Sequence, residues 1–477
     1  MVTESAASIR QRLAVDPNRP RYHFLPPSNW MNDPNGFIQW QGTYHLFYQH
    51  NPNSPLWGDM HWGHATSDDL VHWTDWPIAL APTPGGPDEA GCFSGSAVNN
   101  NGVPTLIYTG TRGARNEVQT QCVATSHDGL QTWQKFMGNP VLPDMPALTK
   151  QSSDFRDPYV WREPDAWYMV VGSRILGVGG VVFLYRSPDL LKWEYLHPLL
   201  INDDKQQADG IWECPNFFKL GDRWVLIISS HTGTTTDTVV YHVGSFENLQ
   251  FKPAYRGVLD NAQLYAPLTT RDDQNRMILI GWVRETRSRD EMLAAGWSGV
   301  QSIPRVLTLD QHDRLCMQPV SALDGLHSAH HHLDARDVSA PTKLAVHGSV
   351  LDIQASFTPA ADGSCGLAVG CSVDGSERLE IVYEAAAQRL FVRIVSAAGI
   401  QDAANHGREV RHELAPQEPL QLRILLDGSV VEIIANERTS LTSRLYLARA
   451  ASDGVQLLGH KARLNTLDIW EMSSIWQ

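Results

Sequence analysis

Short runs of β-branched and aromatic residues recur along the first two thirds of the chain, and turn residues bound each run. Runs of this length and composition are typical of strands. Beyond the first twenty residues, the apolar positions show almost no helical period. The pattern therefore predicts an all-β protein, whose clearest strands lie at 44–50, 104–110, 167–173, 224–230 and 277–283.

A turn element beside these runs recurs four times with a period of about sixty residues. Each copy opens on a serine and closes on an aromatic residue, as in SDDLVHW, and the second copy carries one extra residue. A fixed period with several antiparallel strands per unit is typical of propeller blades. We expect Ser or Asp to cap each turn and the aromatic ring to pack between neighbouring blades. The pairs are Ser67 and Trp73, Ser126 and Trp133, Ser187 and Trp193, and Ser245 and Phe251.

Four copies, together with the strands before the first, predict a five-bladed β-propeller over residues 21–325, after an N-terminal extension at 1–20. Residues 326–341 are polar and show no strand alternation, so this segment is expected to be a linker. Strands return over 342–477. Within them, 389–395 looks largely apolar on both faces of the alternation, which two facing sheets explain. The predicted fold is thus a propeller followed by a β-sandwich domain.

The formal net charge of -14 excludes partners that demand a basic surface, namely nucleic acids and anionic membranes. A soluble enzyme with a neutral small-molecule substrate is compatible with this charge. The sixteen tryptophans either anchor the core or offer platforms for sugar rings. The histidines at 327 and 330–332 show no regular ligand spacing, so we predict neither a metal nor a cofactor. The sequence leaves the oligomeric state open.

The amino terminus lacks a basic segment followed by an apolar one, so it does not resemble a secretory signal. No run approaches the roughly 18 apolar residues that a membrane span needs. The six cysteines are scattered and form no CxxC pair, which favours free thiols in a reducing cytoplasm. They are Cys92, Cys122, Cys214, Cys316, Cys365 and Cys371.

A propeller places the innermost strand of each blade around a central funnel, where residues that are distant in sequence converge. Asp33, in NWMNDPNGF, lies in a turn signal with apolar residues on both sides, which suits a lined pocket. The alternative is a plain surface turn. Asp157, in DFRDPYVW, has aromatic neighbours, and its alternative is an ordinary surface pair with Arg156.

Glu213 is the third unusual acid, because it stands between Trp212 and Cys214 in GIWECPNFF. Desolvation favours the neutral form of a carboxyl group, and a carboxyl that carries a proton near neutral pH can act as a general acid. The alternative is a buried glutamate paired with an arginine. Two carboxyl groups in different environments around one pocket are the equipment of glycoside hydrolysis.

At these residues the sequence resembles glycoside hydrolase family 32, the family of invertases, levanases and inulinases. The resemblance runs along most of the chain, and the joint order and spacing of its motifs are far more specific than any one of them. The matching segments are WMNDPNGF at 30–37, FYQHNP at 47–52, WGDMHWGHATSDDLVHW at 57–73, FSGSAV at 93–98, FRDPYV at 155–160, WECPNFF at 212–218, GWSGVQSIPRVLTL at 296–309 and, in the second domain, 422–446.

The resemblance implies the same fold and a retaining β-fructofuranosidase that works by double displacement without a cofactor. Asp33 matches the nucleophile, Glu213 the acid/base, and Asp157 the acid that binds sugar hydroxyls and stabilises the transition state. Further positions match the substrate pocket: Asn32, Gln49, Trp57, Phe93, Ser94, Arg156 and Trp282.

Two departures from the family pattern put the substrate preference in doubt. Gln263 and Leu264 replace the Asp-Phe that many members carry before Tyr-Ala-Pro. Asn216 follows Glu-Cys-Pro, where relatives often have Asp or Gly. Both spots are expected near the pocket rim. Sucrose, sucrose 6-phosphate, fructooligosaccharides and polymers stay open as substrates, and Arg112, Arg115 and Arg284 are candidate phosphate-binding residues.

The alternatives to hydrolysis with retention are a fructosyltransferase that uses sucrose as donor, an inverting propeller glycosidase and a catalytically silent sugar-binding protein. The second domain shows no evident constellation of acids, so we expect it to pack against the propeller; the alternatives are that it shapes the pocket in a dimer or binds sugar.

Overall fold

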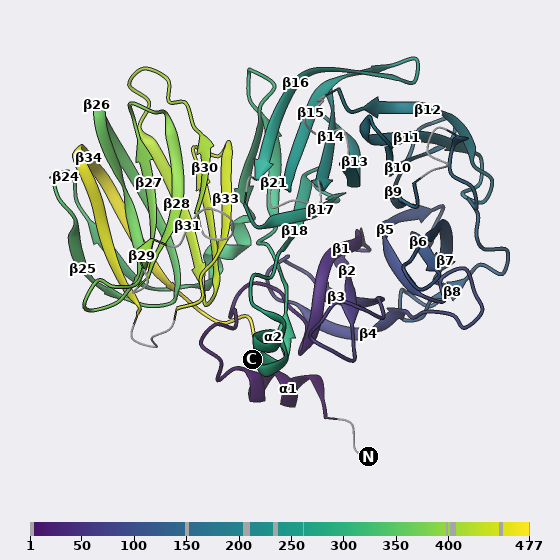
Figure 1. Ribbon diagram of the computed structural model, residues 1–477, viewed down its shortest axis with the longest axis horizontal. Helices are drawn as coiled ribbons and strands as arrows, with labels where there is room; N and C mark the ends of the chain where they lie inside the picture. The colour runs from purple at the N-terminus through teal and green to yellow at the C-terminus, as the bar shows by residue number, and fades with distance from the viewer. Residues whose placement is uncertain are drawn as a thin grey trace.

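The computed structural model describes residues 4–147, 152–203, 210–231, 237–260, 262–396, 399–400, 407–447 and 452–476. Two all-β bodies lie side by side, a ring of five sheets and a sandwich, which confirms the predicted fold class (Figure 1). Helix α1 (Ala6–Leu13) lies beneath the ring, close to the carboxyl end of the chain, where Arg10 covers the ring of Trp476 (Figure 1). Among the described residues, no helix has the length and apolar character to cross a membrane.

Each blade of the propeller is an antiparallel sheet of four consecutive strands, apart from small additions in the first and last blades. The five strands that the sequence predicts most clearly are each the second strand of a blade, where both faces are covered by neighbouring blades. Counted from the centre outwards, the blades are β1 (Asn29–Trp40), β2 (Thr43–Asn51), β3 (His61–Ser67) and β4 (Thr74–Leu80); β5 (Gly91–Asn100), β6 (Val103–Arg112), β7 (Val118–Thr125) and β8 (Gln134–Lys135); β9 (Phe155–Arg162), β10 (Trp167–Ile175), β11 (Gly179–Ser187) and β12 (Glu194–Ile201); β13 (Ile211–Leu220), β14 (Arg223–His231), β15 (Thr238–Glu247) and β16 (Gln250–Asp260); and β17 (Leu264–Arg271), β18 (Met277–Val283), β21 (Arg305–Leu309) and β22 (Leu315–Pro319).

The ring closes through the segment between β18 and β21. Helix α2 (Arg289–Ala295) begins there with a capping box made by Ser288 and Glu291, a local signal that the sequence analysis did not use. After the helix, β19 (Trp297–Ser298) pairs in parallel with β1, and β20 (Val300–Gln301) pairs with β18. The last blade is therefore tied to the first by backbone hydrogen bonds.

The repeated turn element has the caps and packing that its sequence predicts. In three copies the opening serine accepts a hydrogen bond from the backbone N–H of a leucine, and Leu70, Leu130 and Leu190 lie in the left-handed region with φ of 71°, 64° and 67°. The closing aromatic residue packs between blades: Trp133 contacts Phe47 of the first blade edge-on, with ring centroids 5.5 Å apart. The turn thus fixes the spacing between blades as well as the hairpin itself.

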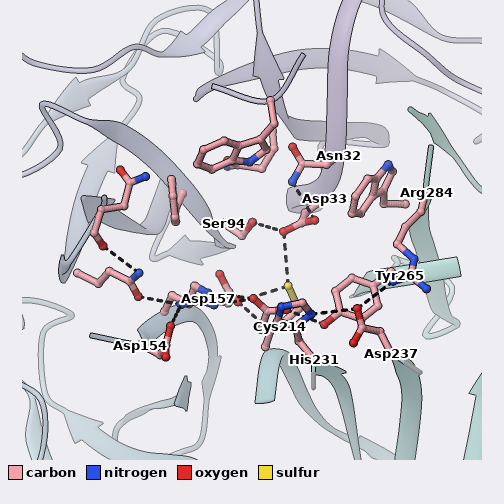
Figure 2. Close-up of a pocket in the computed structure, with 18 of the residues that line it drawn as sticks. Asn32, Asp33, Ser94, Asp154, Asp157, Cys214, His231, Asp237, Tyr265 and Arg284 are labelled. Carbon is pink, nitrogen blue, oxygen red and sulfur yellow. Dashed lines mark hydrogen bonds and ion pairs between the residues drawn. The ribbon is translucent and has the colours of Figure 1, made fainter. Parts of the chain in front are cut away.

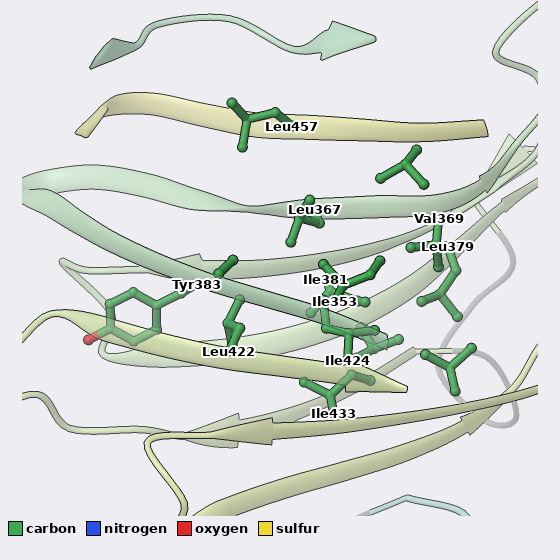
Figure 3. Close-up of a cluster of buried hydrophobic side chains, with 14 of the residues drawn as sticks. Ile353, Leu367, Val369, Leu379, Ile381, Tyr383, Leu422, Ile424, Ile433 and Leu457 are labelled. Carbon is green, nitrogen blue, oxygen red and sulfur yellow. The ribbon is translucent and has the colours of Figure 1, made fainter. Parts of the chain in front are cut away.

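The second domain is built around two long strands, β26 (Val350–Cys371) and β34 (Gly454–Met472), which pair over most of their length. Aliphatic side chains from facing strands fill the interior, among them Leu367, Ile381, Ile424 and Ile433 (Figure 3). The remaining elements are the 3-10 helix η3 (Ser321–Leu326), β23 (His327–Leu333), β24 (Arg336–Val338), β25 (Thr342–His347), β27 (Arg378–Glu384), β28 (Arg389–Ser396), β29 (Gly399–Ile400), β30 (Gly407–Arg411), β31 (Leu420–Asp427), β32 (Val430–Ala435) and β33 (Thr439–Arg444).

Two details of the sequence analysis need correction. The supposed linker at 326–341 contains β23 and β24, which pair antiparallel with β34, and most side chains of β23 are exposed or half-buried. A partner strand supplies the backbone hydrogen bonds, so no apolar alternation is needed in the sequence. In β28 one face alone forms the core, because Leu390 and Val392 are buried while Phe391 is half-buried.

A buried polar network joins the two domains. Arg305 of the last blade forms an ion pair of 2.6 Å with Glu432 of β32, and both side chains are fully buried. His23, which precedes the first blade, contacts Asp427 at 2.9 Å and Glu432 at 3.2 Å. Asp427 also accepts the backbone N–H groups of residues 21–23. The sandwich therefore holds the chain where it enters the propeller.

Candidate active site

A cavity of about 480 Å³ opens at the centre of the ring, and residues from all five blades line its wall (Figure 2). All ten side chains that the sequence assigns to the site lie there. They are Asn32, Asp33, Gln49, Trp57, Phe93, Ser94, Arg156, Asp157, Glu213 and Trp282. Asp33, Asp157 and Glu213, which were predicted to meet, thus share one cavity, whereas their chemical roles stay predictions.

The innermost strand of every blade has a β-bulge beside the residues that it contributes to the cavity. Register shifts fall at residues 32–33, 94, 157–158, 214–215 and 266–267, where the innermost strand gains one residue on its neighbour. A bulge leaves an extra residue unpaired and re-aims its side chain. In four of the bulges the second residue or the one that follows is a proline, which has no N–H to leave unpaired.

The backbone at three of these bulges adopts a conformation that side chains rarely allow. Asp157, Cys214 and Ala266 have φ of 66°, 46° and 46°, and each precedes a proline. Left-handed backbone costs a non-glycine residue on the order of 1–2 kcal/mol. The surrounding blades impose this strain on the innermost strands, two of which carry Asp157 and Glu213.

Asp33 is held by uncharged donors. The Ser94 hydroxyl donates to Oδ2 at 2.6 Å and the Asn32 amide donates to Oδ1 at 3.0 Å (Figure 2). Burial raises the pKa of Asp33 to about 6, and these donors only partly offset it. Near neutral pH the carboxylate is therefore mostly ionised but weakly solvated, which leaves it free to attack an electrophile.

Asp157 lies across the cavity from Asp33. Its Oδ2 accepts the backbone N–H of Cys214 at 2.9 Å, and the Cys214 thiol lies 3.5 Å from the same oxygen and 3.7 Å from Oδ2 of Asp33 (Figure 2). Burial raises the pKa of Asp157 to about 7, because neighbouring Arg156 does not fully compensate for it. The thiol thus stands between two carboxyls that repel each other.

Glu213 is held by a cation and a phenol. Arg156 donates to its Oε1 through Nη2 at 2.7 Å and Nε at 3.1 Å, and the Tyr265 hydroxyl donates to Oε2 at 2.6 Å. The alternative that the sequence left open, a buried glutamate paired with an arginine, is therefore present, and it coincides with the predicted site. Arg156 is shared, because Asp154 also binds it at 2.7 Å. The glutamate is fixed in orientation from both sides.

Several residues of the cavity escaped the sequence analysis. Asp237 forms ion pairs with His231 at 2.9 Å and with Arg284 at 3.1 Å, and its hydrogen bond raises the pKa of His231. Arg284 also lies over the ring of Tyr265, 5.1 Å from its centroid. A sequence signal for Tyr265 did exist, because it stands two residues before Pro267. Glu213 stands at the same distance before Pro215 in the preceding blade.

The two departures noted in the sequence do not lie on the rim of this cavity. Asn216 is fully buried and joins two blades, since its amide donates to the carbonyl of Pro267 at 2.8 Å and its carbonyl accepts from Thr269. Gln263 is buried beside the sandwich, where its N–H donates to the carbonyl of Thr442. Their replacement in this chain therefore affects packing between blades and domains.

Aromatic rings form part of the cavity wall. Trp57 is 53% exposed and meets Phe93 edge-on at 6.0 Å between ring centroids. Trp282 meets Trp30 at 5.9 Å. An exposed indole beside polar groups is suited to stacking against the apolar face of a sugar ring.

Comparison with known proteins gives a consistent result over residues 23–471. The family model for the glycosyl hydrolases family 32 N-terminal domain matches residues 23–319, and that for the family 32 C-terminal domain matches residues 320–471. Sucrose-6-phosphate hydrolase of Escherichia coli is 36% identical, covering 93% of this chain and 94% of its own. Levanase of Bacillus subtilis is 31% identical, covering 96% and 71%.

Solved structures agree with this result. Fructan 1-exohydrolase IIa from Cichorium intybus superposes with a TM-score of 0.84 at 28% identity, covering 96% of this chain and 98% of its own. Sucrose-6-phosphate hydrolase from Lactobacillus gasseri gives 0.83 at 26% identity, covering 98% and 96%.

Proposed function

The chain belongs to glycosyl hydrolase family 32 and is an invertase-type β-fructofuranosidase, and from that premise we propose that it releases terminal β-D-fructofuranosyl units from sucrose and related fructosides by double displacement. The observation that carries the proposal is the convergence of Asp33, Asp157 and Glu213 in one cavity of about 480 Å³, a volume suited to a small sugar.

Asp33 is the nucleophile of the proposed first step. Its carboxylate oxygen attacks the anomeric carbon, the bond from that carbon to the leaving sugar breaks, and Glu213 transfers its proton to the departing oxygen. A covalent fructosyl-enzyme results. In the second step Glu213, now a base, takes a proton from water, whose oxygen displaces Asp33 and releases fructose with retained configuration.

The residues around Asp33 and Glu213 stabilise charge or hold these two groups in position in this scheme. Asp157 faces the charge that develops on the sugar and binds its hydroxyl groups, which stabilises an oxocarbenium-like transition state. Tyr265 and Arg156 hold Glu213 in place through its two oxygens. Ser94 and Asn32 fix the attacking carboxylate of Asp33 through hydrogen bonds. Pre-organisation of this kind contributes a large share of enzymatic rate enhancement.

Replacement of the acids tests the proposal. Asp33→Asn and Glu213→Gln should each lower turnover of sucrose by about a thousandfold or more, since neither amide can attack or transfer a proton. Calorimetric binding of sucrose and an unchanged melting temperature would show that the variants are folded. Near-normal turnover in either variant would reject the assignment.

Retention is tested separately by adding methanol as an acceptor. A covalent fructosyl-enzyme passes its sugar to methanol as methyl β-D-fructofuranoside, which proton NMR identifies. An inverting enzyme would not form this anomer. Chromatography of the products at high sucrose separates a hydrolase from the alternative fructosyltransferase, because transfer yields trisaccharides in place of free fructose.

Substrate choice within the family depends on the outer wall of the cavity. The relatives named sucrose-6-phosphate hydrolase point to a phosphorylated sugar as one candidate. Arg115 is an exposed cation on the wall, whereas Arg284 is paired with Asp237. A hydrolysis panel of sucrose, sucrose 6-phosphate, raffinose, inulin and levan, repeated with Arg115→Ala, would identify the preferred substrate. A selective loss of activity on the phosphorylated sugar would assign Arg115 to its phosphate.

The proposal also includes a cytoplasmic location and a small-molecule sugar as the substrate. All six cysteines are free in the structure, five of them buried, which accords with a reducing compartment.

A further inference from the structure

Two histidines on the outer face of the sandwich converge on one carboxylate. His330 and His332 are separated by one residue on β23, so their side chains share a face of the strand. Asp468 lies opposite His332 on β34. Nε2 of His330 and Nδ1 of His332 lie 2.9 Å and 2.7 Å from the same oxygen, Oδ1 of Asp468. The spacing of these histidines matches no metal motif in the sequence, but on a strand it places both side chains on one face.

Three ligand atoms of the right chemical type lie together here. The two ring nitrogens and the carboxylate oxygen are all within 4.8 Å of one another. Zn²⁺ binds imidazole nitrogen at about 2.0–2.1 Å and carboxylate oxygen at about 2.0–2.2 Å, so a tetrahedral ion needs ligand atoms about 3.4 Å apart. Small outward rotations of side chains that are 45%, 47% and 24% exposed would admit the ion.

Neighbouring groups contact all three side chains and restrict their orientation. Trp470 stacks on the ring of His330, with centroids 4.7 Å apart and planes 7° from parallel. The second nitrogen of His332 faces the carboxylate of Asp334 at 3.4 Å, and the Thr466 hydroxyl donates to the other oxygen of Asp468 at 3.2 Å. A carboxylate behind a ligating histidine and a hydrogen bond behind a ligating carboxylate are the usual outer contacts of metal ligands.

A second cluster of two aspartates and a histidine lies nearby, but an arginine already neutralises its charge. Asp324, His327 and Asp352 are equally close, but the guanidinium of Arg423 binds both aspartates at 2.7 Å and supplies the positive charge. Among the ion pairs of the described residues, the partners of Asp468 are the two histidines, and no lysine or arginine contacts it. That carboxylate therefore has no permanently charged partner among the described residues, unlike the two aspartates beside Arg423.

We infer that His330, His332 and Asp468 form a surface site for a borderline divalent cation such as Zn²⁺, with water in the remaining position, and that the bound ion clips β23 to β34. The ion replaces the protons that the two imidazoles now direct at Asp468. Since β23 is the first strand after the propeller, the clip secures the chain where it enters the sandwich. The two imidazole ligands suit Zn²⁺, Ni²⁺ and Cu²⁺ better than Mg²⁺ or Ca²⁺, which prefer oxygen ligands.

Calorimetric titration of the full chain with Zn²⁺ alone, after treatment with a chelator, tests the inference. One ion should bind to the wild type, and His330→Ala or His332→Ala should weaken that binding by more than about tenfold, because even outer contacts of metal ligands are worth tenfold in affinity. The matched control is His347→Ala, which removes an exposed histidine paired with a single aspartate, Asp453, and should leave the affinity unchanged.

Thermal unfolding gives a second readout that does not depend on activity. Saturating Zn²⁺ should raise the melting temperature of the wild type and of His347→Ala, because an ion that binds only the folded state stabilises it. The same increase in His330→Ala and His332→Ala would overturn the inference, as would equal Zn²⁺ affinity in all four proteins or no binding at about 100 μM Zn²⁺.

Discussion

Burial in the cavity raises the pKa of individual carboxyl groups, and the effect is clearest for two aspartates. Burial raises the pKa of Asp33 to about 6 and that of Asp157 to about 7, even though Ser94 and the N–H of Cys214 donate hydrogen bonds to them. Each carboxyl is therefore harder to ionise in the folded protein than in the unfolded chain. Both rate and stability should depend on pH for this reason.

The pH profile of hydrolysis follows from the ionisation of Asp33 and Asp157. Both acts, attack by Asp33 and charge stabilisation by Asp157, need an ionised carboxylate, so kcat/KM for sucrose should begin to fall below about pH 7 and fall more steeply below about pH 6. Initial rates at low sucrose between pH 4 and 8 give the profile. Pre-incubation at each pH followed by assay at pH 7 separates unfolding from titration. A constant kcat/KM down to pH 4 would contradict the role of Asp33.

Asp157→Asn should make the protein more stable at pH 8 while it abolishes most activity. The folded pKa of Asp157 lies above the unfolded value, so the folded state holds the proton more tightly, and stability is lost as pH rises from about 4 through about 7. Asparagine removes that loss and can still accept the N–H of Cys214. The melting temperature should rise by about 1–2 °C at pH 8 and change little at pH 4.

A neighbouring aspartate provides the matched control for this measurement. Burial acts on Asp154 too, but Arg156 and Arg174 outweigh it and hold its pKa below the usual value. Its contribution to stability is therefore present above the unfolded pKa, and Asp154→Asn should lower the melting temperature at pH 8. Equal shifts in both variants would show that the amide itself, and not the charge, determines the change.

Elements position the acids through the bulges of the innermost strands and through the turn that closes the ring. Gly299 lies in that turn, between β19 and β20, with φ of +75°. A Cβ added there would lie 1.8 Å from the carbonyl oxygen of Met31, which is backbone of β1, the strand that carries Asp33. The close approach of this turn to β1 therefore links the closure of the ring to the position of the nucleophile.

Gly299→Ala should lower kcat by about tenfold or more, because β1 must move to relieve the clash and small displacements of a catalytic group cost large factors in rate. The control is Gly177→Ala, in the hairpin between β10 and β11. Gly177 has the same φ of +75° but nothing within 4 Å of an added Cβ. It therefore carries the conformational cost without the clash, and its kcat should stay near normal. Similar kcat values for both variants would contradict the proposed coupling.

At the scale of the whole molecule, buried charged residues join the propeller to the sandwich. Burial would lower the pKa of His23, but its hydrogen bonds with Asp427 and Glu432 outweigh it and raise the pKa to about 8. Burial would likewise raise the pKa of Glu432, but Arg305 and His23 lower it to about 2. These opposite shifts describe one ionised network across the interface, so the propeller and the sandwich should unfold together.

Removing one member of this network should be costly. Glu432→Gln leaves Arg305 buried without its counter-charge, which costs about 3–5 kcal/mol and should lower the melting temperature by several degrees. Glu384→Gln is the control, because Glu384 forms a similar pair with Arg389 on the surface and should have little effect. Calorimetry should show one transition for the wild type. Two separate transitions would show that the domains do not depend on this contact.

Much of the architecture was predictable, because strand runs and turn signals are local. The repeat around Ser67, Ser126 and Ser187 indicated the blades, and the confirmed five-bladed ring follows from its period. The strands at 327–338 were not predictable in this way, since their backbone partner, β34, lies more than a hundred residues away. Asn216 was misplaced for the same reason, because its buried partners belong to the next blade.

The sequence by itself determined the class of fold, the number of blades and ten of the residues that line the cavity, the three acids among them, because each depends on short segments whose composition restricts their conformation. Only the tertiary structure decided how those residues meet: the pairing of Arg156 with Glu213, the thiol between Asp33 and Asp157, and the convergence of His330 and His332 on Asp468. Distances between side chains on different strands depend on register and bulges, which no single segment encodes.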